Sequence, residues 1–216
     1  MKKIGLLLIG LTITVITNGQ ILKIQGGTSI STLDWKLNGI DVRAFEKTLI
    51  GYSFFAGIDY LDKQYFNLSS NIGMVRKGGK GTIPLMSIGG DIITEYIEKA
   101  TLDYLTINTT IDFKYPVKET IYPFISFGPR FDYLLCSSNL FNAISEFDGM
   151  KSTSIGIILG GGLKYDISNL QFGLRADYYL NFSDKVAEWT INSAGDGGQV
   201  FVNAFTINLT IGYRLK

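Results

Sequence analysis

The stretch FTINLTIGYRL (residues 205–215) decides the fold, because its apolar residues alternate strictly with small or polar ones. Phe205, Ile207, Leu209, Ile211 and Tyr213 take every second position, and threonine, asparagine, glycine or arginine fills the positions between them. Successive side chains of a β-strand point to opposite faces, so the stretch predicts a strand with one apolar and one polar face. A tilted strand crosses a bilayer in about 9–11 residues, and this one is long enough.

The same alternation recurs upstream. It is clear at 105–115, 155–165 and 170–180, and weaker at 21–31, 50–61, 65–76 and 120–135. Short connections at 61–64, 116–119 and 166–169 separate some of these segments, and long connections at about 32–49, 77–100, 136–152 and 183–200 separate the others. Outer-membrane barrels alternate short periplasmic turns with long extracellular loops in this way. The sequence therefore predicts an all-β, antiparallel, up-and-down transmembrane barrel of about eight strands.

The polar faces of these segments carry most of the charge. The residues concerned are Asp112, Lys114, Arg130, Asp132, Lys164, Arg175, Asp177 and Arg214. A soluble barrel would turn these residues outward, whereas a membrane barrel turns them into its interior. Strand length and a glycine-rich polar face favour the membrane form, and so do the aromatic residues near predicted strand ends. We therefore predict that the eight residues form a structural charge network in the lumen.

The aromatic residues near predicted strand ends are typical of interfacial belts. They are Tyr52, Tyr60, Tyr104, Tyr115, Tyr122, Tyr133, Tyr165, Phe182 and Tyr213. Two prolines interrupt the 120–135 segment, where a closed barrel has no free edge to accommodate a missing backbone donor. We expect Pro123 at the start of that strand and a β-bulge near Gly128-Pro129.

The amino terminus predicts a signal peptide. Met1-Lys2-Lys3 is basic, residues 4–16 are apolar, and Gly19 is a small residue suited to cleavage. The apolar run is shorter than the roughly 20 residues that a membrane-spanning helix needs. We therefore expect a leader at 1–19 and one barrel domain at 20–216, exported to the bacterial outer membrane.

Composition argues against several functions. The chain has no histidine, which removes the commonest general base and metal ligand. Its one cysteine, Cys136, cannot form an intrachain disulfide, and we interpret it as a small residue near a strand end. A net charge of +1 without a basic patch does not suggest nucleic-acid binding. We predict no catalytic residues, no metal site, no cofactor and no enzymatic activity.

Several segments together resemble the PorT-like outer-membrane β-barrel family of Bacteroidetes. They are 71–80 (NIGMVRKGGK), 102–107 (LDYLTI), 122–130 (YPFISFGPR) and 160–165 (GGGLKY). Where many members carry Glu-Ile-Pro in the fourth strand, this chain has Thr106-Ile107-Asn108. The resemblance implies a porin-family barrel in the outer membrane, with a basic glycine turn after the third strand. It implies no catalytic or ligand-binding residues.

Four functions remain open at this level. The first is a non-enzymatic barrel that displays its long loops or supports the envelope, and the second is a transport or protein-secretion component of type IX-like character. The third is a soluble periplasmic barrel of lipocalin type, and the fourth is a lipid-modifying enzyme that works without histidine. The expected partners are outer-membrane lipid and lipopolysaccharide, the barrel-assembly machinery during insertion, and a protein at the long loops.

Overall fold

The computed structural model describes residues 20–42, 45–87, 92–118, 120–138, 150–182, 185–190 and 197–215. The predicted leader lies outside these residues. The described part of the chain forms ten strands: β1 (Ile21–Leu37), β2 (Ile40–Val42), β3 (Lys47–Asp62), β4 (Phe66–Met86), β5 (Ile92–Lys114), β6 (Ile121–Ser137), β7 (Thr153–Ile167), β8 (Leu170–Asn181), β9 (Lys185–Thr190) and β10 (Gly197–Arg214). None of the described residues belongs to a helix long and apolar enough to cross a membrane.

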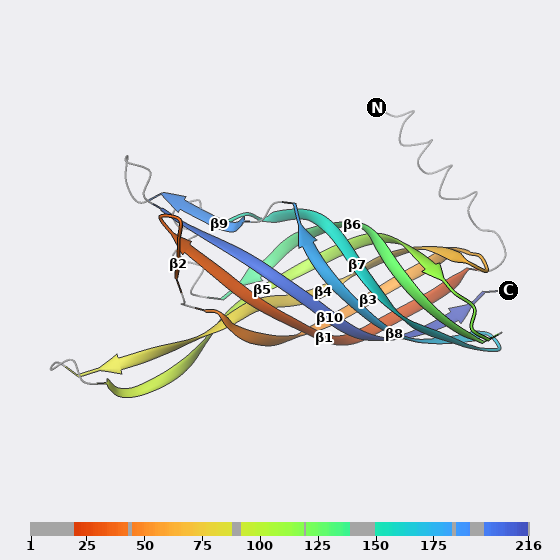
Figure 1. Cartoon of the computed structure of the whole chain (residues 1–216), viewed down its shortest axis with the longest axis horizontal. Coiled ribbons are helices and arrows are strands. Elements are labelled where there is room, and N and C mark those ends of the chain that lie inside the picture. Colours follow the sequence, from red (N-terminus) through yellow and green to blue (C-terminus); the bar gives the residue numbers. More distant parts are fainter. Residues whose placement is uncertain are drawn as a thin grey trace, which may run out of the picture.

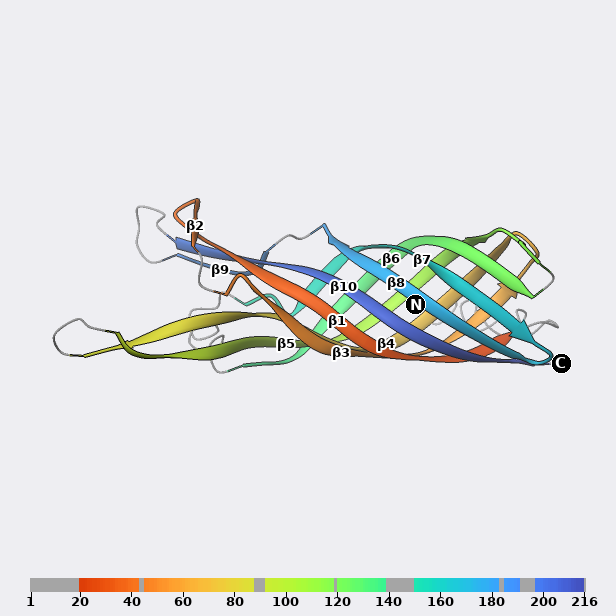
Figure 2. The same ribbon diagram turned by 60° about the horizontal axis from the view of Figure 1, so that its bottom comes forward.

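Eight strands close into a ring in the order β1-β3-β4-β5-β6-β7-β8-β10, each antiparallel to its neighbours (Figures 1 and 2). The ring closes because β1 pairs with β10 along its whole length, from Ile21↔Arg214 to Leu37↔Gly198. The short strands β2 and β9 only extend β1 and β10 at one end. The predicted fold, an up-and-down barrel with an eight-stranded ring, is confirmed.

The two ends of the barrel differ, as predicted. The connections β3–β4, β5–β6 and β7–β8 are short and lie at the end where β1 begins and β10 finishes. There the Leu215 amide donates to the Gln20 carbonyl over 2.7 Å, which ties the first and last described residues together. By the rule for such barrels this is the periplasmic end, and the opposite end is extracellular.

The side chains have the polarity of a membrane barrel. Leu209 is 67 % exposed and Ile125 is 68 % exposed on the outer wall, whereas the interior residues Asp112 and Arg130 are 0 % and 2 % exposed. Isoleucine, leucine, phenylalanine and tyrosine continue this outer surface around the ring as an apolar belt. A belt of this kind is stable against acyl chains and costly against water. The soluble lipocalin alternative required the opposite polarity.

Two aromatic residues assigned to the interfacial belts face inward instead. Tyr104 is 2 % exposed inside the barrel, and the Tyr122 ring lies 5.6 Å from the Lys114 ammonium, which also points inward. Both residues stand near strand ends, but strand-end position does not determine the face. Their parity along β5 and β6, together with the cations they contact, places them in the interior.

The described parts of the segment 77–100, predicted as a loop, continue the sheet as β4 to Met86 and as β5 from Ile92. β4 and β5 pair without a register shift from Phe66↔Phe113 to Leu85↔Thr94, and this ribbon runs well beyond the barrel (Figures 1 and 2). The predicted glycine turn at 77–80 therefore lies within β4. Residues 92–97 at the outer part of the ribbon are all exposed, on both faces, so no apolar–polar alternation marks it in the sequence. Parts of 32–49 and 183–200 are likewise strand.

The bulge predicted at Gly128-Pro129 is absent. The β5–β6 register is the same on both sides, Asn108↔Arg130 and Ile111↔Phe127, and only the pairs between them are missing. The ladder to β7 stays continuous through Pro129↔Ile157. Pro129 therefore interrupts the pairing of β6 with β5 but does not change the register between the two strands. The register shift of this pair lies between Asp103 and Tyr104. Pro123 is near the start of β6, as expected.

Candidate functional site

The lumen is the one place where the eight predicted charged residues are brought towards each other. The structure distributes them over three levels between the periplasmic and extracellular ends. Each level combines predicted residues with cations or carboxylates that the sequence analysis did not single out.

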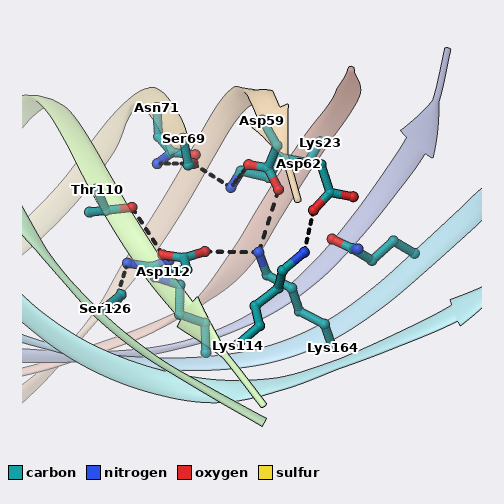
Figure 3. A network of polar contacts seen from close by, with 12 residues as sticks. Lys23, Asp59, Asp62, Ser69, Asn71, Thr110, Asp112, Lys114, Ser126 and Lys164 are labelled. Atoms are coloured by element: carbon teal, nitrogen blue, oxygen red, sulfur yellow. Dashed lines mark hydrogen bonds and ion pairs between the residues drawn. The ribbon is translucent and has the colours of Figure 1, made fainter. Parts of the chain in front are cut away.

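The central level, here called the central network, consists of Lys23, Asp59, Asp112, Lys164, Arg175 and Asp177. Figure 3 labels the first four of these residues. Lys164 Nζ lies 2.8 Å from Asp112 Oδ2 and 3.5 Å from Asp59 Oδ2. Arg175 joins Asp112 through Nη1 at 3.2 Å and Asp177 through Nε at 2.7 Å. Lys23 completes this series of ion pairs by pairing with Asp59.

The central network is neutral and tightly enclosed. Its three cations face three carboxylates, and its six residues are all buried. Hydroxyl groups satisfy further donors, because Ser69 accepts from Lys23 at 2.6 Å and Ser126 accepts from Arg175 at 2.9 Å. Charges of this kind are stable in a low-dielectric interior only when they are paired and hydrogen-bonded, and these are both.

The second level lies nearer the extracellular end and has two cations for one carboxylate. Asp132 Oδ2 lies 2.7 Å from Lys77 Nζ and 3.1 Å from Arg130 Nε. Thr106 also donates to this carboxylate over 2.7 Å. The aromatic faces of Tyr104 and Tyr179 supplement the single carboxylate: Lys77 Nζ is 4.9 and 4.7 Å from the two ring centroids, and the Arg130 guanidinium is 4.7 Å from that of Tyr179.

The third level is the periplasmic mouth. Arg214 Nη2 lies 3.1 Å from Asp62 Oδ2 and 2.9 Å from Asp166 Oδ2, and Lys114 also pairs with Asp62. These residues line a hollow of about 670 Å³, which is open to the periplasmic side. Arg214 is the most exposed of the eight predicted residues, with 37 % of its side chain accessible, because it lies at the rim rather than in the bore.

An apolar cluster occupies the extracellular half of the interior. Its buried members are Leu33, Phe45, Ala100, Leu102, Tyr104, Val186, Ala187, Val200 and Val202, with Trp35, Leu134 and Met150 packed against them. β9 contributes Val186 and Ala187, and a bridge between Met150 and Ala187 ties the cluster to the segment before β7. This apolar cap lies over the second level, so ionic and apolar groups together fill the interior.

Sequence reasoning missed five members of these levels: Lys23, Asp59, Asp62, Lys77 and Asp166. Lys23 and Asp59 lie in weakly alternating segments, yet each stands between two outward-facing apolar residues. This position in the alternation was the signal that could have placed both side chains in the lumen. Lys77 lies in the segment expected to be a turn. Asp62 and Asp166 lie at the ends of β3 and β7, where the sequence analysis placed the short connections, and their side chains reach into the mouth.

The arrangement supports structure rather than chemistry at these carboxylates. Asp59, Asp112, Asp132 and Asp177 each contact at least one buried cation. Across the described ranges, no three histidine, cysteine, aspartate or glutamate residues are placed to hold a metal ion. Together the three levels link all eight strands of the ring, since Arg214 adds β10 to the strands joined by the other residues.

Comparison with known proteins gives structural matches only. No family model and no curated protein sequence matches the chain, so the PorT-like resemblance stays a prediction. The outer membrane protein OprG from Pseudomonas aeruginosa is similar with a TM-score of 0.51 and 14 % identity, covering 92 % of this chain and 97 % of that one. Two other structures also match: Ail of Yersinia pestis and the outer membrane protease OmpT of Escherichia coli.

Ail matches with a TM-score of 0.44 and 12 % identity, over 92 % of this chain and all (100 %) of its own. OmpT matches with 0.49 and 9 %, over 93 % of this chain and 98 % of its own. At these identities the similarity to OprG shows the fold alone: an outer-membrane β-barrel. A closed barrel with a lipid-facing apolar belt is the architecture of bacterial outer-membrane proteins, and the chain is located in that membrane.

Proposed function

We propose that the protein is a non-enzymatic, closed outer-membrane barrel that holds the β4–β5 ribbon outside the cell as a display element. The filled interior carries this proposal. An eight-stranded barrel has an interior just wide enough for side chains to fill. Here the central network, the second level and the apolar cap occupy successive heights of it, which argues against a path for solutes.

The ribbon supports the display role. Among the described residues, β4 beyond Lys80 pairs with no strand other than β5, and β5 before Leu102 pairs with no strand other than β4. Ile92, Ile93 and Ile97 are 58, 69 and 65 % exposed on it. Isolated two-stranded hairpins are marginally stable in water, so a ribbon of this length with exposed isoleucines suits contact with a partner outside the membrane.

Planar-bilayer recording tests the closed barrel. The purified, folded protein is expected to give no discrete openings, because the central network, the second level and the apolar cap fill the bore. The variant Arg130→Ala/Lys77→Ala removes the two cationic side chains of the second level and serves as a comparison that loosens the plug. Stable unitary openings in the unchanged protein would refute the closed barrel and favour the transport or secretion alternative.

Epitope insertion tests the display role separately. An epitope replacing residues 88–91, between the described ends of β4 and β5, is expected to bind antibody on intact cells. The matched control places the same epitope at Ser168-Asn169, in a periplasmic turn, and is expected to bind only after the outer membrane is disrupted. The reverse result, or binding at neither site in folded protein, would contradict the proposed orientation and display.

A further inference from the structure

A row of three lysines crosses the outer wall just above the apolar belt. Lys47 of β3 is opposite Lys80 of β4, and Lys80 is opposite Lys99 of β5. Adjacent strands are about 4.8 Å apart, so the three backbone positions lie within roughly 10 Å. The three residues, here called the lysine row, come from chain segments that only the sheet brings together.

The row faces outward. Arg76 and Asp103 form an ion pair on the outer wall, and Lys80 and Lys99 follow on the same two strands at four-residue distances. An even number of residues along a strand returns to the same face. Lys47 joins that face, since its Nζ donates to Thr82 Oγ1 over 2.6 Å and Thr82 is two residues beyond Lys80.

The apolar cap holds the row from behind. Phe45, which precedes β3, and Ala100, next to Lys99, belong to the cap and are 6 and 0 % exposed. The buried Leu49 does not share the outward face of Lys47, because the β3–β4 register shifts beyond Thr48. Gly79, next to Lys80, lies so close to β3 that an added Cβ would stand 2.1 Å from the Phe45 carbonyl oxygen. The three backbones are therefore fixed against each other, and the lysine row is presented by a packed part of the wall.

The lysine row places three like charges side by side on neighbouring strands. Like charges directly opposite each other on neighbouring strands are unfavourable. Arg76, on the wall below, is neutralised by two hydrogen bonds of 2.7 Å to Asp103. In the described part of the chain no carboxylate forms such an ion pair with Lys47, Lys80 or Lys99. An anion from outside the protein would relieve this repulsion.

The height of the row indicates which anion. On β4 the outward apolar positions end at Met74, and Arg76 follows with its guanidinium 4.9 Å from the Tyr52 ring. Tyrosine and arginine side chains of this kind are typical of the membrane–water interface. Lys80 lies four residues further out, about 13 Å along the strand. Its ammonium therefore stands at the level of the outer-leaflet headgroups rather than of the acyl chains.

We propose that the lysine row binds the phosphorylated saccharide headgroup of an outer-leaflet glycolipid. Three adjacent ammonium groups present up to eight N–H donors besides the one that Thr82 accepts, and phosphate oxygens are strong acceptors for them. The site lies on the lateral surface of the barrel, where such a lipid packs beside the wall. It is independent of the display role, because it needs neither the tip of the ribbon nor a closed lumen.

The test measures binding of diphosphorylated lipid A, dephosphorylated lipid A and phosphatidylglycerol to the folded full chain in a non-ionic detergent. The site variant is Lys47→Gln/Lys80→Gln/Lys99→Gln. The control, Lys63→Gln/Lys118→Gln/Lys151→Gln, removes the same charge from exposed positions outside the row. Near an anionic surface each lysine contributes about fivefold, so the site variant is expected to bind diphosphorylated lipid A roughly 100-fold more weakly, and the control unchanged.

Dephosphorylated lipid A is expected to bind the unchanged protein and the site variant alike. Unchanged affinity of the site variant for diphosphorylated lipid A would overturn the proposal. So would equally tight, equally lysine-dependent binding of phosphatidylglycerol, since the row would then be a general anionic-surface contact. If the triple variant fails to fold, Lys80→Gln alone is expected to weaken binding about fivefold, and no loss there would also overturn it.

Discussion

Replacing Asp132 by asparagine should destabilise the barrel more than the same replacement at Asp112, although both carboxylates are buried and both contact two cations. Asp112 shares its cations with other carboxylates: Lys164 keeps Asp59 at 3.5 Å, and Arg175 keeps Asp177 at 2.7 Å. Asp132 does not share them. Among the described residues, it is the only carboxylate that pairs with Lys77 or Arg130.

The magnitudes follow from this difference. Asp112→Asn weakens two charge-assisted hydrogen bonds without leaving a cation unpaired, and should lower the free energy of unfolding by about 1.5–3 kcal/mol. Asp132→Asn leaves two buried cations facing only neutral groups, and breaking a buried pair in this way costs about 3–5 kcal/mol. The two tyrosine rings at this level reduce the cost only in part. We expect the variants to differ by about 2 kcal/mol.

Equilibrium unfolding in urea, with the barrel in lipid vesicles, measures both variants against the unchanged protein. Heat modifiability on gels confirms that each variant folds. Adding Lys77→Met to Asp132→Asn removes one of the two unpaired cations and should recover part of the loss. Equal destabilisation of the two single variants, or a larger effect at Asp112, would refute the reasoning. It would show that the second carboxylate partners of Lys164 and Arg175 do not compensate for the loss of Asp112.

Two further predictions concern the outer wall. Leu209→Arg, in the middle of the lipid-facing part of β10, should lower the free energy of unfolding in vesicles by about 2–4 kcal/mol. The control Asn203→Arg faces outward on the same strand but beyond the belt, and should lower that free energy much less. Equal effects of the two variants would contradict the assigned belt. Cys136, at the extracellular edge of β6, donates to Asp103 Oδ2 over 3.3 Å, and this hydrogen bond raises the pKa of its thiol. Asp103→Asn should therefore lower that pKa and speed alkylation by iodoacetamide at pH 8, whereas an unchanged or slower rate would show that the carboxylate does not hold the thiol proton.

Strand identity and the choice of faces were predictable from local pattern. Stretches such as 105–115 and 205–215 alternate because one face meets acyl chains and the other meets the lumen, and each residue obeys that rule independently of its partners. The short turns were predictable for a related reason, since breaks in the alternation mark where a strand leaves the bilayer.

The β4–β5 ribbon was not predictable in this way. Beyond the acyl-chain region neither of its faces meets an apolar medium, so glycine-rich and mixed residues such as those at 78–82 form strand without any periodic signature. Tyr104 and Tyr122 show the same limit at single positions. An aromatic residue near a strand end can lie in an interfacial belt or contact a buried cation. Whether its position along the strand is on the outward or the inward face decides which.

By itself, then, the sequence determined that the chain alternates as a lipid-facing barrel with a charged interior. Only the tertiary structure decided which charges meet. Asp112 finds Lys164 and Arg175 because β5, β7 and β8 curve around one narrow bore, and Lys47, Lys80 and Lys99 align because the β3–β4–β5 register places them side by side. Alternation is a property of each strand alone, whereas register and closure belong to the whole ring.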